Sequence, residues 1–132
     1  MKRKRLKKKS SNPLPKLKAE AWRLWSRFIR YSAVEKDGLV QCFTCPERRP
    51  PEKMQAGHFK HGRLDFDKRN IRPQCPACNK WWSGRLDVYA ENLIKESGPG
   101  IIEEISRDAN VAHKYSRQEL EETIEKYKEW DR

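Results

Sequence analysis

The stretch QAGHFKHGRLDFDKRNIRPQCPACN, residues 55–79, ends in one of the two C-x2-C pairs of the chain. This pair is Cys75 and Cys78, and the other pair, Cys42 and Cys45, lies upstream. Each pair turns the chain so that two sulfur atoms face one metal ion, and two pairs complete a tetrahedral site. Zinc suits four thiolates because it has no redox chemistry, and a site closed by four ligands is structural. An iron–sulfur cluster or two disulfides are the alternative interpretations.

Short strands and a helix are expected around the cysteines. A strand is expected in residues 38–45 and a second one in residues 54–60, followed by a connecting loop over residues 61–70. The next segment suggests a turn that enters a helix near Pro76. Because the metal would tie both ends of the loop to one point, residues 38–85 are expected to form a zinc-bracketed core.

Three polar residues inside this core have a spacing that suggests chemistry. His58, Asn70 and Asn79 form the pattern H-x11-N-x8-N, and Asn79 directly follows the last cysteine. Taken singly, a histidine or an asparagine is more often a structural residue. A strand, a loop and a helix closed by one metal would nevertheless bring the three side chains together. Hydrolysis of a phosphodiester needs such a set, because a base must activate water and a cation must neutralise the leaving oxygen.

Helices are expected on both sides of the core. Residues 16–31 carry apolar side chains at helical spacing. The opposite side of this helix is a basic ridge, either solvated or in contact with phosphates, made of Lys16, Arg23, Arg27 and Arg30. The C-terminal part, residues 86–132, is expected to be a helical extension in three pieces, 86–97, 99–108 and 116–130. Ser116 and Glu119 have the spacing of a capping box at the start of the last piece.

The composition is typical of one small domain with a small core. The chain has 132 residues, of which 37% are charged, and its mean hydropathy is −1.09. A chain this polar often needs a metal or a disulfide to hold its fold. We therefore expect an α+β fold in a single domain, residues 16–132, preceded by a disordered basic arm, residues 1–15.

The net charge of +11 is unevenly distributed and suggests a polyanionic partner. Residues 2–9 carry seven positive charges, and residues 10–85 carry sixteen positive and seven negative ones. Residues 86–132 carry seven positive and twelve negative charges. A basic first part joined to an acidic last part favours DNA contacts made by the first 85 residues. The alternative for the lysine run is a solubilising tail.

The sequence favours a cytoplasmic protein without a membrane span. No apolar run approaches the length that a transmembrane helix needs, and no apolar segment follows the basic N-terminus as it would in a signal peptide. In a reducing compartment, four cysteines are more often metal ligands than disulfides.

The run AGHFKHGRLDFDKRNIRPQCPACNKWWSGRL, residues 56–86, resembles the NinG/Rap recombination nucleases of lambdoid phages. These belong to the zinc-knuckle form of the HNH (ββα-metal) endonuclease superfamily. The shared features are the cysteine pairs, the AGH-aromatic strand, the R-N-I element and the asparagine after the last cysteine. The likeness covers roughly residues 17–130. The resemblance implies a small HNH-like core and a metal-dependent nuclease that cuts branched recombination intermediates such as Holliday junctions and D-loops.

The resemblance also implies roles for individual residues. His58 would be the general base, Asn70 the organiser of the loop, and Asn79 a ligand of a catalytic Mg²⁺ or Mn²⁺. Phage endonuclease VII, another member of the superfamily, has a metal-binding aspartate immediately before its catalytic histidine. Here that position is Gly57, so a second ligand would have to come from the loop. We expect Asp67 in this role.

Other residues of the loop receive weaker assignments. Asp65 and His61 are alternatives to Asp67 as the second ligand, and water or substrate phosphates could also fill the place. For the two aspartates, pairing with nearby cations is the competing interpretation. His61 would lie on the opposite face from His58 if the strand continued, so we expect it to be non-catalytic.

DNA contacts are expected from cations along the core and the first helix. Besides Arg23, Arg27 and Arg30, the candidate residues are Arg63, Lys68, Arg69, Arg72, Lys80 and Arg85. Trp81 and Trp82 follow the ligand position; one is expected to pack beside the zinc, and the other to pack likewise or to stack on an unpaired base.

The last helix carries an apolar stripe formed by Leu120, Ile124 and Tyr127 and continued by Trp130. Packing on the domain is the first interpretation of this stripe, and a homodimer contact is the second. The dimer would matter for function, because symmetric cuts across a junction require two active sites.

Three functions compete on these grounds. The first is a metal-dependent, structure-selective DNA endonuclease. The second is a non-catalytic zinc module that binds branched or single-stranded DNA, which would not need His58 and the asparagines at this spacing. The third is a zinc-stabilised protein-interaction domain, which leaves the basic first 85 residues unexplained.

Overall fold

Two small antiparallel sheets and four α-helices form the part of the protein, residues 12–131, that the computed structural model describes. Most of the basic arm therefore lies outside the described residues. The α-helices are α1 (Leu14–Tyr31), α2 (Leu86–Ser97), α3 (Ile101–Ala109) and α4 (Arg117–Tyr127). The strands are β1 (Val40–Gln41), β2 (Arg48–Arg49), β3 (Gln55–His58) and β4 (Ile71–Gln74). Three short helical turns complete the chain, at Pro51–Lys53 (η1), Ala77–Trp81 (η2) and Lys128–Trp130 (η3).

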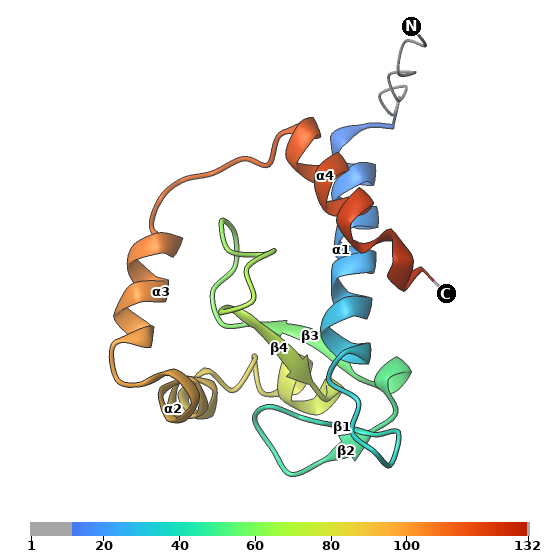
Figure 1. Ribbon diagram of the computed structural model, residues 1–132. Helices are drawn as coiled ribbons and strands as arrows, with labels where there is room; N and C mark the ends of the chain where they lie inside the picture. Colours follow the sequence, from blue (N-terminus) through green and yellow to red (C-terminus); the bar gives the residue numbers. More distant parts are fainter. Residues whose placement is uncertain (1–11, 132) are drawn as a thin grey trace, which may run out of the picture.

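The hairpin of β3 and β4 lies at the centre of the molecule, with α1 and α4 on one side and α2 and α3 on the other (Figure 1). Its register pairs Gln55 with Gln74 and His58 with Ile71. Sequence patterns indicated β3 but missed β4, because Pro73 stands inside that strand and proline argues against strand pairing. They also missed β2, whose two residues pair with β1 in the segment between the two expected strands.

Helix α1 covers the hairpin with an apolar face. Trp25 and Ile29 of this helix pack against Ala56 of β3 and Ile71 of β4. The helix begins at Leu14, two residues before the expected start at Lys16, with Pro15 in its first turn. Proline suits the first turn of a helix, since the N–H that it lacks would have no partner there.

Helix α4 packs along α1 near the chain's C-terminus (Figure 1). Leu120 is buried against Leu17 and Ala21 of α1, and Tyr127 packs on Trp25 and Phe28. The apolar stripe of the last helix thus packs on the domain. The capping box is present, with the Ser116 hydroxyl accepting from the N–H of Glu119 and the Glu119 carboxylate from the N–H of Ser116.

Helices α2 and α3 enclose the loop between β3 and β4 from the other side. Helix α2 has the expected bounds, whereas α3 begins at Ile101 rather than at residue 99. A buried cluster joins these two helices to Phe59 and Leu64 of the loop; its helical members are Tyr89, Leu93, Ile101 and Ile105. The loop is therefore packed on both sides, which gives its side chains fixed positions.

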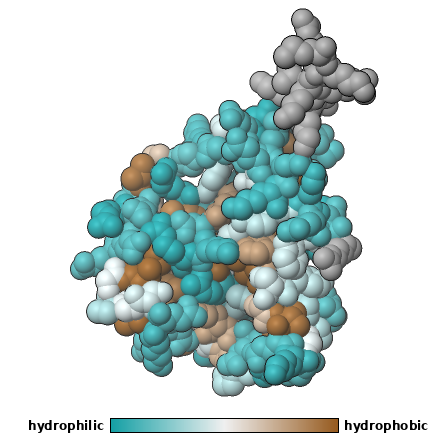
Figure 2. Space-filling view, viewed as in Figure 1, coloured by the Kyte–Doolittle hydropathy of each residue, from teal (hydrophilic) through white to brown (hydrophobic). Residues whose placement is uncertain are grey.

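The surface is mostly hydrophilic, with small scattered hydrophobic patches on the face drawn in Figure 2. This agrees with the high proportion of charged residues. Within residues 12–131, no helix has the length and apolar character that crossing a membrane would require.

Candidate functional site: a cysteine cluster beside a histidine hollow

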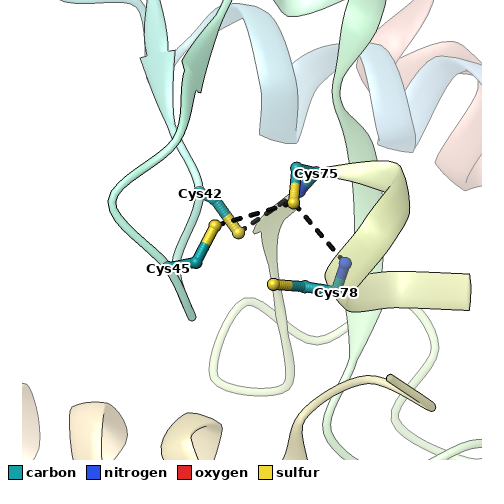
Figure 3. Close-up of side chains that lie close together, drawn as sticks. All are labelled: Cys42, Cys45, Cys75 and Cys78. Carbon is teal, nitrogen blue, oxygen red and sulfur yellow. Dashed lines mark hydrogen bonds between the residues drawn. The ribbon is translucent and has the colours of Figure 1, made fainter. Parts of the chain in front are cut away.

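The four cysteines converge from the β1–β2 hairpin and from the start of η2 (Figure 3). Their sulfur atoms lie within 4.8 Å of one another, and Cys45 Sγ is 3.7 Å from Cys75 Sγ. All four are free thiols. Such a cluster could bind a structural metal such as zinc, because four sulfur ligands at this separation match a tetrahedral thiolate site.

Backbone amides around the cluster favour the thiolate form of Cys42. The N–H of Cys75 donates to Cys42 Sγ over 3.3 Å, and the N–H of Cys78 donates to Cys75 Sγ over 3.5 Å. Burial by itself raises the pKa of the Cys42 thiol, but hydrogen bonds from Cys75 and Thr44 outweigh it and lower the pKa to about 7. Burial has the opposite effect on two other members of the cluster, because it raises the pKa of the Cys45 and Cys75 thiols. Metal binding needs thiolates, so Cys42 is the thiol of these three that the surroundings favour as a ligand.

His58 is the last residue of β3, and its imidazole is held between two other rings. The indole of Trp22, from α1, stacks on it with ring centroids 4.6 Å apart and an interplanar angle of 10°. The imidazole of His61 stacks on it at 4.3 Å. These contacts leave the His58 side chain 15% exposed. The ring is therefore fixed in orientation while an edge remains accessible.

Asp65 completes this cluster. Its Oδ1 lies 3.1 Å from His58 Nε2 and accepts the N–H of Gly62 at 2.8 Å, while its Oδ2 lies 3.4 Å from Lys18 Nζ. Burial raises the pKa of Asp65, but the bonds from His58 and Gly62 outweigh it and hold the pKa below the ordinary value. Asp65 is thus a buried, ionised partner of His58. His58, His61 and Asp65 form a set whose ring nitrogens and carboxylate could also hold a metal ion.

The structure turns Asp67, our expected second ligand, away from this cluster. Its carboxylate accepts from the backbone N–H of Arg69 at 2.9 Å and from the guanidinium of the same residue. Asp65 lies at His58 instead, because a turn from Gly62 to Asp65 folds the loop back over the end of β3. The choice of Asp67 rested on its nearness to Asn70 in sequence, whereas in the structure Asp65 is the aspartate that contacts His58 and Asp67 contacts Arg69.

The expectation that His61 faces away from His58 is wrong for a related reason. It assumed that the strand continued, whereas β3 ends at His58 and the chain turns at Lys60. The buried side chain of Asn70 holds that turn: its Oδ1 accepts the N–H of Lys60, and its Nδ2 donates to the carbonyls of Lys60 and Leu64. Asn70 therefore fastens the loop and places His61 over His58.

Asn79 lies in η2 and lines the same hollow as His58. Its Nδ2 donates to Gln55 Oε1 over 2.7 Å, and no hydrogen bond from residues 12–131 engages its Oδ1. The hollow has a volume of about 620 Å³, and the residues on its wall include Trp22, Arg30, His58, His61, Asn79 and Lys80. The structure thus brings the histidine and the last asparagine of the sequence pattern to one cavity, with two cations beside them.

Gly57 has no space for a side chain. A Cβ at this position would lie 1.7 Å from Gln74 Oε1, on the paired strand. Gln74 is fully buried, and its Nε2 donates to Thr44 Oγ1 and to the carbonyl of Gly84. Its Oε1 is buried and has no hydrogen-bond partner in the described residues. An aspartate at position 57 would therefore clash with Gln74 as it packs in this structure.

The expected DNA-contacting cations fall into two groups. Those in the first group are held by other parts of the protein. Arg23 pairs with Asp131, Arg27 donates to the carbonyl of Trp130, Arg69 joins Asp67, Glu104 and Asp108, Arg72 pairs with Glu96, and Lys68 lies over the ring of Phe28. The second group has no carboxylate at ion-pair distance within residues 12–131, and it includes Arg63, Lys80 and Arg85.

Arg30 is a special member of this set because it lines the hollow. Its guanidinium donates to the carbonyl of Pro51 at 2.9 Å and to Ser26 Oγ at 3.0 Å. Burial lowers its pKa, although an arginine stays charged under any physiological condition. It therefore places a fixed positive charge on the wall of the hollow.

Neither tryptophan that follows Asn79 packs into the core. Trp81 is 83% exposed and Trp82 is 60% exposed, so the expectation that one packs beside the cysteines is wrong. The tryptophan that the site does use is Trp22, which the sequence presented only as part of a helical apolar face. Trp22, His61, Asp65 and Gln74 are the site residues that sequence patterns missed or undervalued.

Comparison with known proteins places the chain among phage proteins. The family model described as Bacteriophage Lambda NinG protein matches residues 1–132. Curated relatives named "Protein ninG" include those of Escherichia phage 933W, 32% identical, Salmonella phage P22, 31% identical, and Escherichia phage lambda, 30% identical. Each match covers 77% of this chain, and the chain spans about half the length of these relatives, 50%, 49% and 49% respectively. No solved structure matches the chain.

Proposed function

The chain belongs to the NinG family of bacteriophage proteins, and on that premise we propose that it is a metal-dependent DNA endonuclease of the HNH type that acts on branched DNA. The observation that carries the proposal is the contact between His58 Nε2 and Asp65 Oδ1 at the edge of a hollow that Asn79 and two cations also line. DNA binding alone does not require a histidine whose ring is stacked between two other rings and hydrogen-bonded to a buried carboxylate.

His58 is the general base in this proposal. When its Nε2–H donates to Asp65, its Nδ1 keeps a lone pair that can take a proton from the attacking water. The stacked rings of Trp22 and His61 prevent the imidazole from rotating away. Asp65 acts through His58, as an ionised partner that fixes the tautomer and stabilises the imidazolium once the proton has moved.

The residues around the hollow fit a divalent cation. Asn79 Oδ1, on the wall of the hollow, is an oxygen ligand of the kind that Mg²⁺ and Mn²⁺ accept, and solvent or phosphate oxygens can complete the coordination of Mg²⁺. When bound, such an ion neutralises the charge that develops on the phosphate and the leaving oxygen. Arg30 and Lys80 add positive charge to the same wall and would orient the phosphate.

The remaining parts of the proposal concern the scaffold and its partner. Zinc in the cysteine cluster would be structural, because four thiolates leave no open position. Branched DNA is proposed as substrate from the resemblance to junction-cutting nucleases. Symmetric cutting of a four-way junction would require two copies of the chain on one DNA.

The test is cleavage of an end-labelled four-way junction and of a linear duplex, each with and without Mg²⁺ or Mn²⁺. The variants His58→Ala and Asp65→Asn are compared with two matched controls. His113→Ala removes a histidine that pairs with Glu119 away from the hollow, and Asp67→Asn removes the aspartate held by Arg69. We expect loss of cleavage by about 10²–10⁴-fold in His58→Ala, since general-base catalysis contributes that much, and cleavage close to wild type in both controls.

Two results would refute this proposal in different ways. If no divalent ion supports cleavage of any DNA, the nuclease proposal is refuted, and binding of the same DNAs then distinguishes the non-catalytic DNA-binding module from the protein-interaction domain. If His58→Ala cleaves as fast as His113→Ala, the protein is a nuclease but its base is another group.

A further inference from the structure

Trp81 and Trp82 are the two most exposed large apolar side chains in residues 12–131. The other three tryptophans are packed: Trp25 is 1% exposed, Trp22 stacks on His58, and Trp130 packs on Phe28. Exposed tryptophans cost hydrophobic free energy, so two in succession indicate an interaction surface rather than chance.

The backbone that presents these rings is held in an unusual conformation. Ser83, Gly84 and Arg85 all have positive φ, at 51°, 86° and 45°. Two of the three are not glycine, and left-handed backbone at such residues persists only where the surroundings impose it. This turn, residues 83–85, follows η2, and the two tryptophan side chains that precede it are exposed.

Three hydrogen bonds fix this turn to the rest of the site. The N–H of Gly84 donates to the carbonyl of Cys78, and the carbonyl of Gly84 accepts from Gln74 Nε2 at 2.8 Å. The N–H of Trp82 donates to the carbonyl of Ala77. A Cβ on Gly84 would come within 3.9 Å of the carbonyl oxygen of His58. The turn that follows the tryptophans is therefore fixed to Cys78 and Gln74, and it lies close to the backbone of the proposed base.

The charges around the pair suit a nucleic acid strand. Lys80 precedes the tryptophans and lines the His58 hollow, and Arg85 follows them with its guanidinium 5.2 Å from the centre of the Trp82 ring. Neither cation is paired with a carboxylate within the described part of the chain. A separate hollow of about 570 Å³ lies beside Trp82, with Arg85, Leu86 and Asp87 on its wall. Aromatic faces flanked by cations are the combination with which proteins hold unpaired bases.

We propose that Trp81 and Trp82 form a stacking platform for unpaired bases next to a DNA branch point, while the strand's phosphates run past Lys80 into the His58 hollow. This inference rests on the proposed action on DNA and gives it a source of selectivity. The bases of an intact duplex are stacked on one another and offer no free face. Bases at a branch, a flap or a single-stranded gap do offer one, so the platform favours branched over linear DNA.

The test measures binding without any added divalent ion, so that it does not depend on cleavage. The probes are a branched DNA that carries 2-aminopurine at an unpaired position beside the branch, and a linear duplex with the same label. The variants are Trp81→Ala and Trp82→Ala, with Trp81→Phe and Trp82→Phe to restore a ring. Val111→Ala is the control, because Val111 is a 54% exposed apolar residue outside the site. Circular dichroism establishes that each variant is folded.

Wild type is expected to quench the 2-aminopurine fluorescence of the branched probe and to leave that of the duplex unchanged. Each alanine variant should lose roughly 5- to 150-fold in affinity for the branched probe, because the substitution removes the aromatic ring on which one base stacks. The phenylalanine variants should recover most of that loss, and Val111→Ala should bind like wild type. Duplex affinity should change by no more than about twofold in all of them, since phosphate contacts dominate it.

Equal losses on branched and linear DNA, or no loss and no quenching, would overturn the platform even if the protein cleaves DNA. Quenching and selective loss in a protein that cleaves nothing would support the platform and refute the nuclease. The two proposals can therefore fail separately.

Discussion

The amide oxygen of Gln74 occupies the space in which any side chain on Gly57 would have to begin. The two residues lie on neighbouring strands, and a Cβ at Gly57 would meet Oε1 at 1.7 Å and Cδ at 2.6 Å. Gln74 cannot move aside freely, because it is fully buried and its amide nitrogen is bound by Thr44 and Gly84. The residue before His58 is therefore determined by a side chain on the opposite strand.

Gly57→Ala should destabilise the protein by about 1–3 kcal/mol, the usual cost of forcing an extra methyl into a packed interior. Gln74→Ala should relieve that clash. The double variant should therefore lose less unfolding free energy than the two single variants together, by about 0.5–3 kcal/mol. Urea unfolding of the four proteins measures this coupling. Gly100→Ala is the control, since nothing lies within 4 Å of a Cβ there. Strictly additive effects of the two changes would contradict the packing described.

Removal of the metal should unfold the protein, whereas removal of the proposed base should not. Cys75→Ser takes one thiolate from a cluster whose zinc would contribute roughly 10 kcal/mol or more to folding, as in small zinc domains. We expect that this variant binds no zinc and loses its cooperative melt, and that His58→Ala retains both. Metal analysis and a circular dichroism melt measure the contrast. Comparable loss of structure in the two variants would refute it.

Lys80 and Arg69 should behave differently although both are cations near the site. Lys80 is exposed and unpaired within residues 12–131, so Lys80→Ala should reduce the slope of log affinity against log salt by about one. Arg69 joins three carboxylates, Asp67, Glu104 and Asp108, and thereby ties the loop to α3. Arg69→Gln should leave the salt slope unchanged and cost about 1–3 kcal/mol in unfolding free energy. If Arg69→Gln did change the slope of log affinity against log salt, Arg69 would be one of the residues that contact DNA.

The Asp67–Arg69 pair should make stability depend on pH in the acid range. The guanidinium of Arg69 holds the pKa of Asp67 below its ordinary value of 3.8. A depressed pKa in the folded state stabilises the protein fully above that ordinary value, and the stabilisation disappears as the pH falls through the folded pKa. Wild type should therefore be more stable than Asp67→Asn at pH 7, and the difference should shrink below about pH 4. Thermal melts of both proteins over this range measure it, and a difference independent of pH would contradict this cause.

Much of the scaffold could be predicted from the sequence because its signals are local. The spacing of the cysteines indicated one cluster, the bounds of α2 followed from helical periodicity, and Ser116 with Glu119 gave the cap of α4. The helix bounds and the cap depend on residues a few positions apart, and the cluster depends on two such C-x2-C pairs. Strand β4 was missed because Pro73 argues against pairing, a local rule that the tertiary packing of the hairpin overrides.

The composition of the site depended on contacts that no local pattern encodes. Asp65 rather than Asp67 reaches His58 because Asn70, far along the loop, anchors the turn at Lys60. The exposure of Trp81 depends in the same way on the left-handed turn that follows it.

The stack of Trp22 on His58 has a consequence for any attempt to shorten the protein. The cysteines and the histidine lie within residues 38–85, yet one of the two rings that hold the imidazole comes from α1, outside that segment. A transplant of residues 38–85 into another scaffold would carry all four cysteines and leave the imidazole of His58 stacked on one face only. The shortest segment that keeps both stacking rings on His58 is thus longer than the segment that holds the four cysteines. It must also include α1.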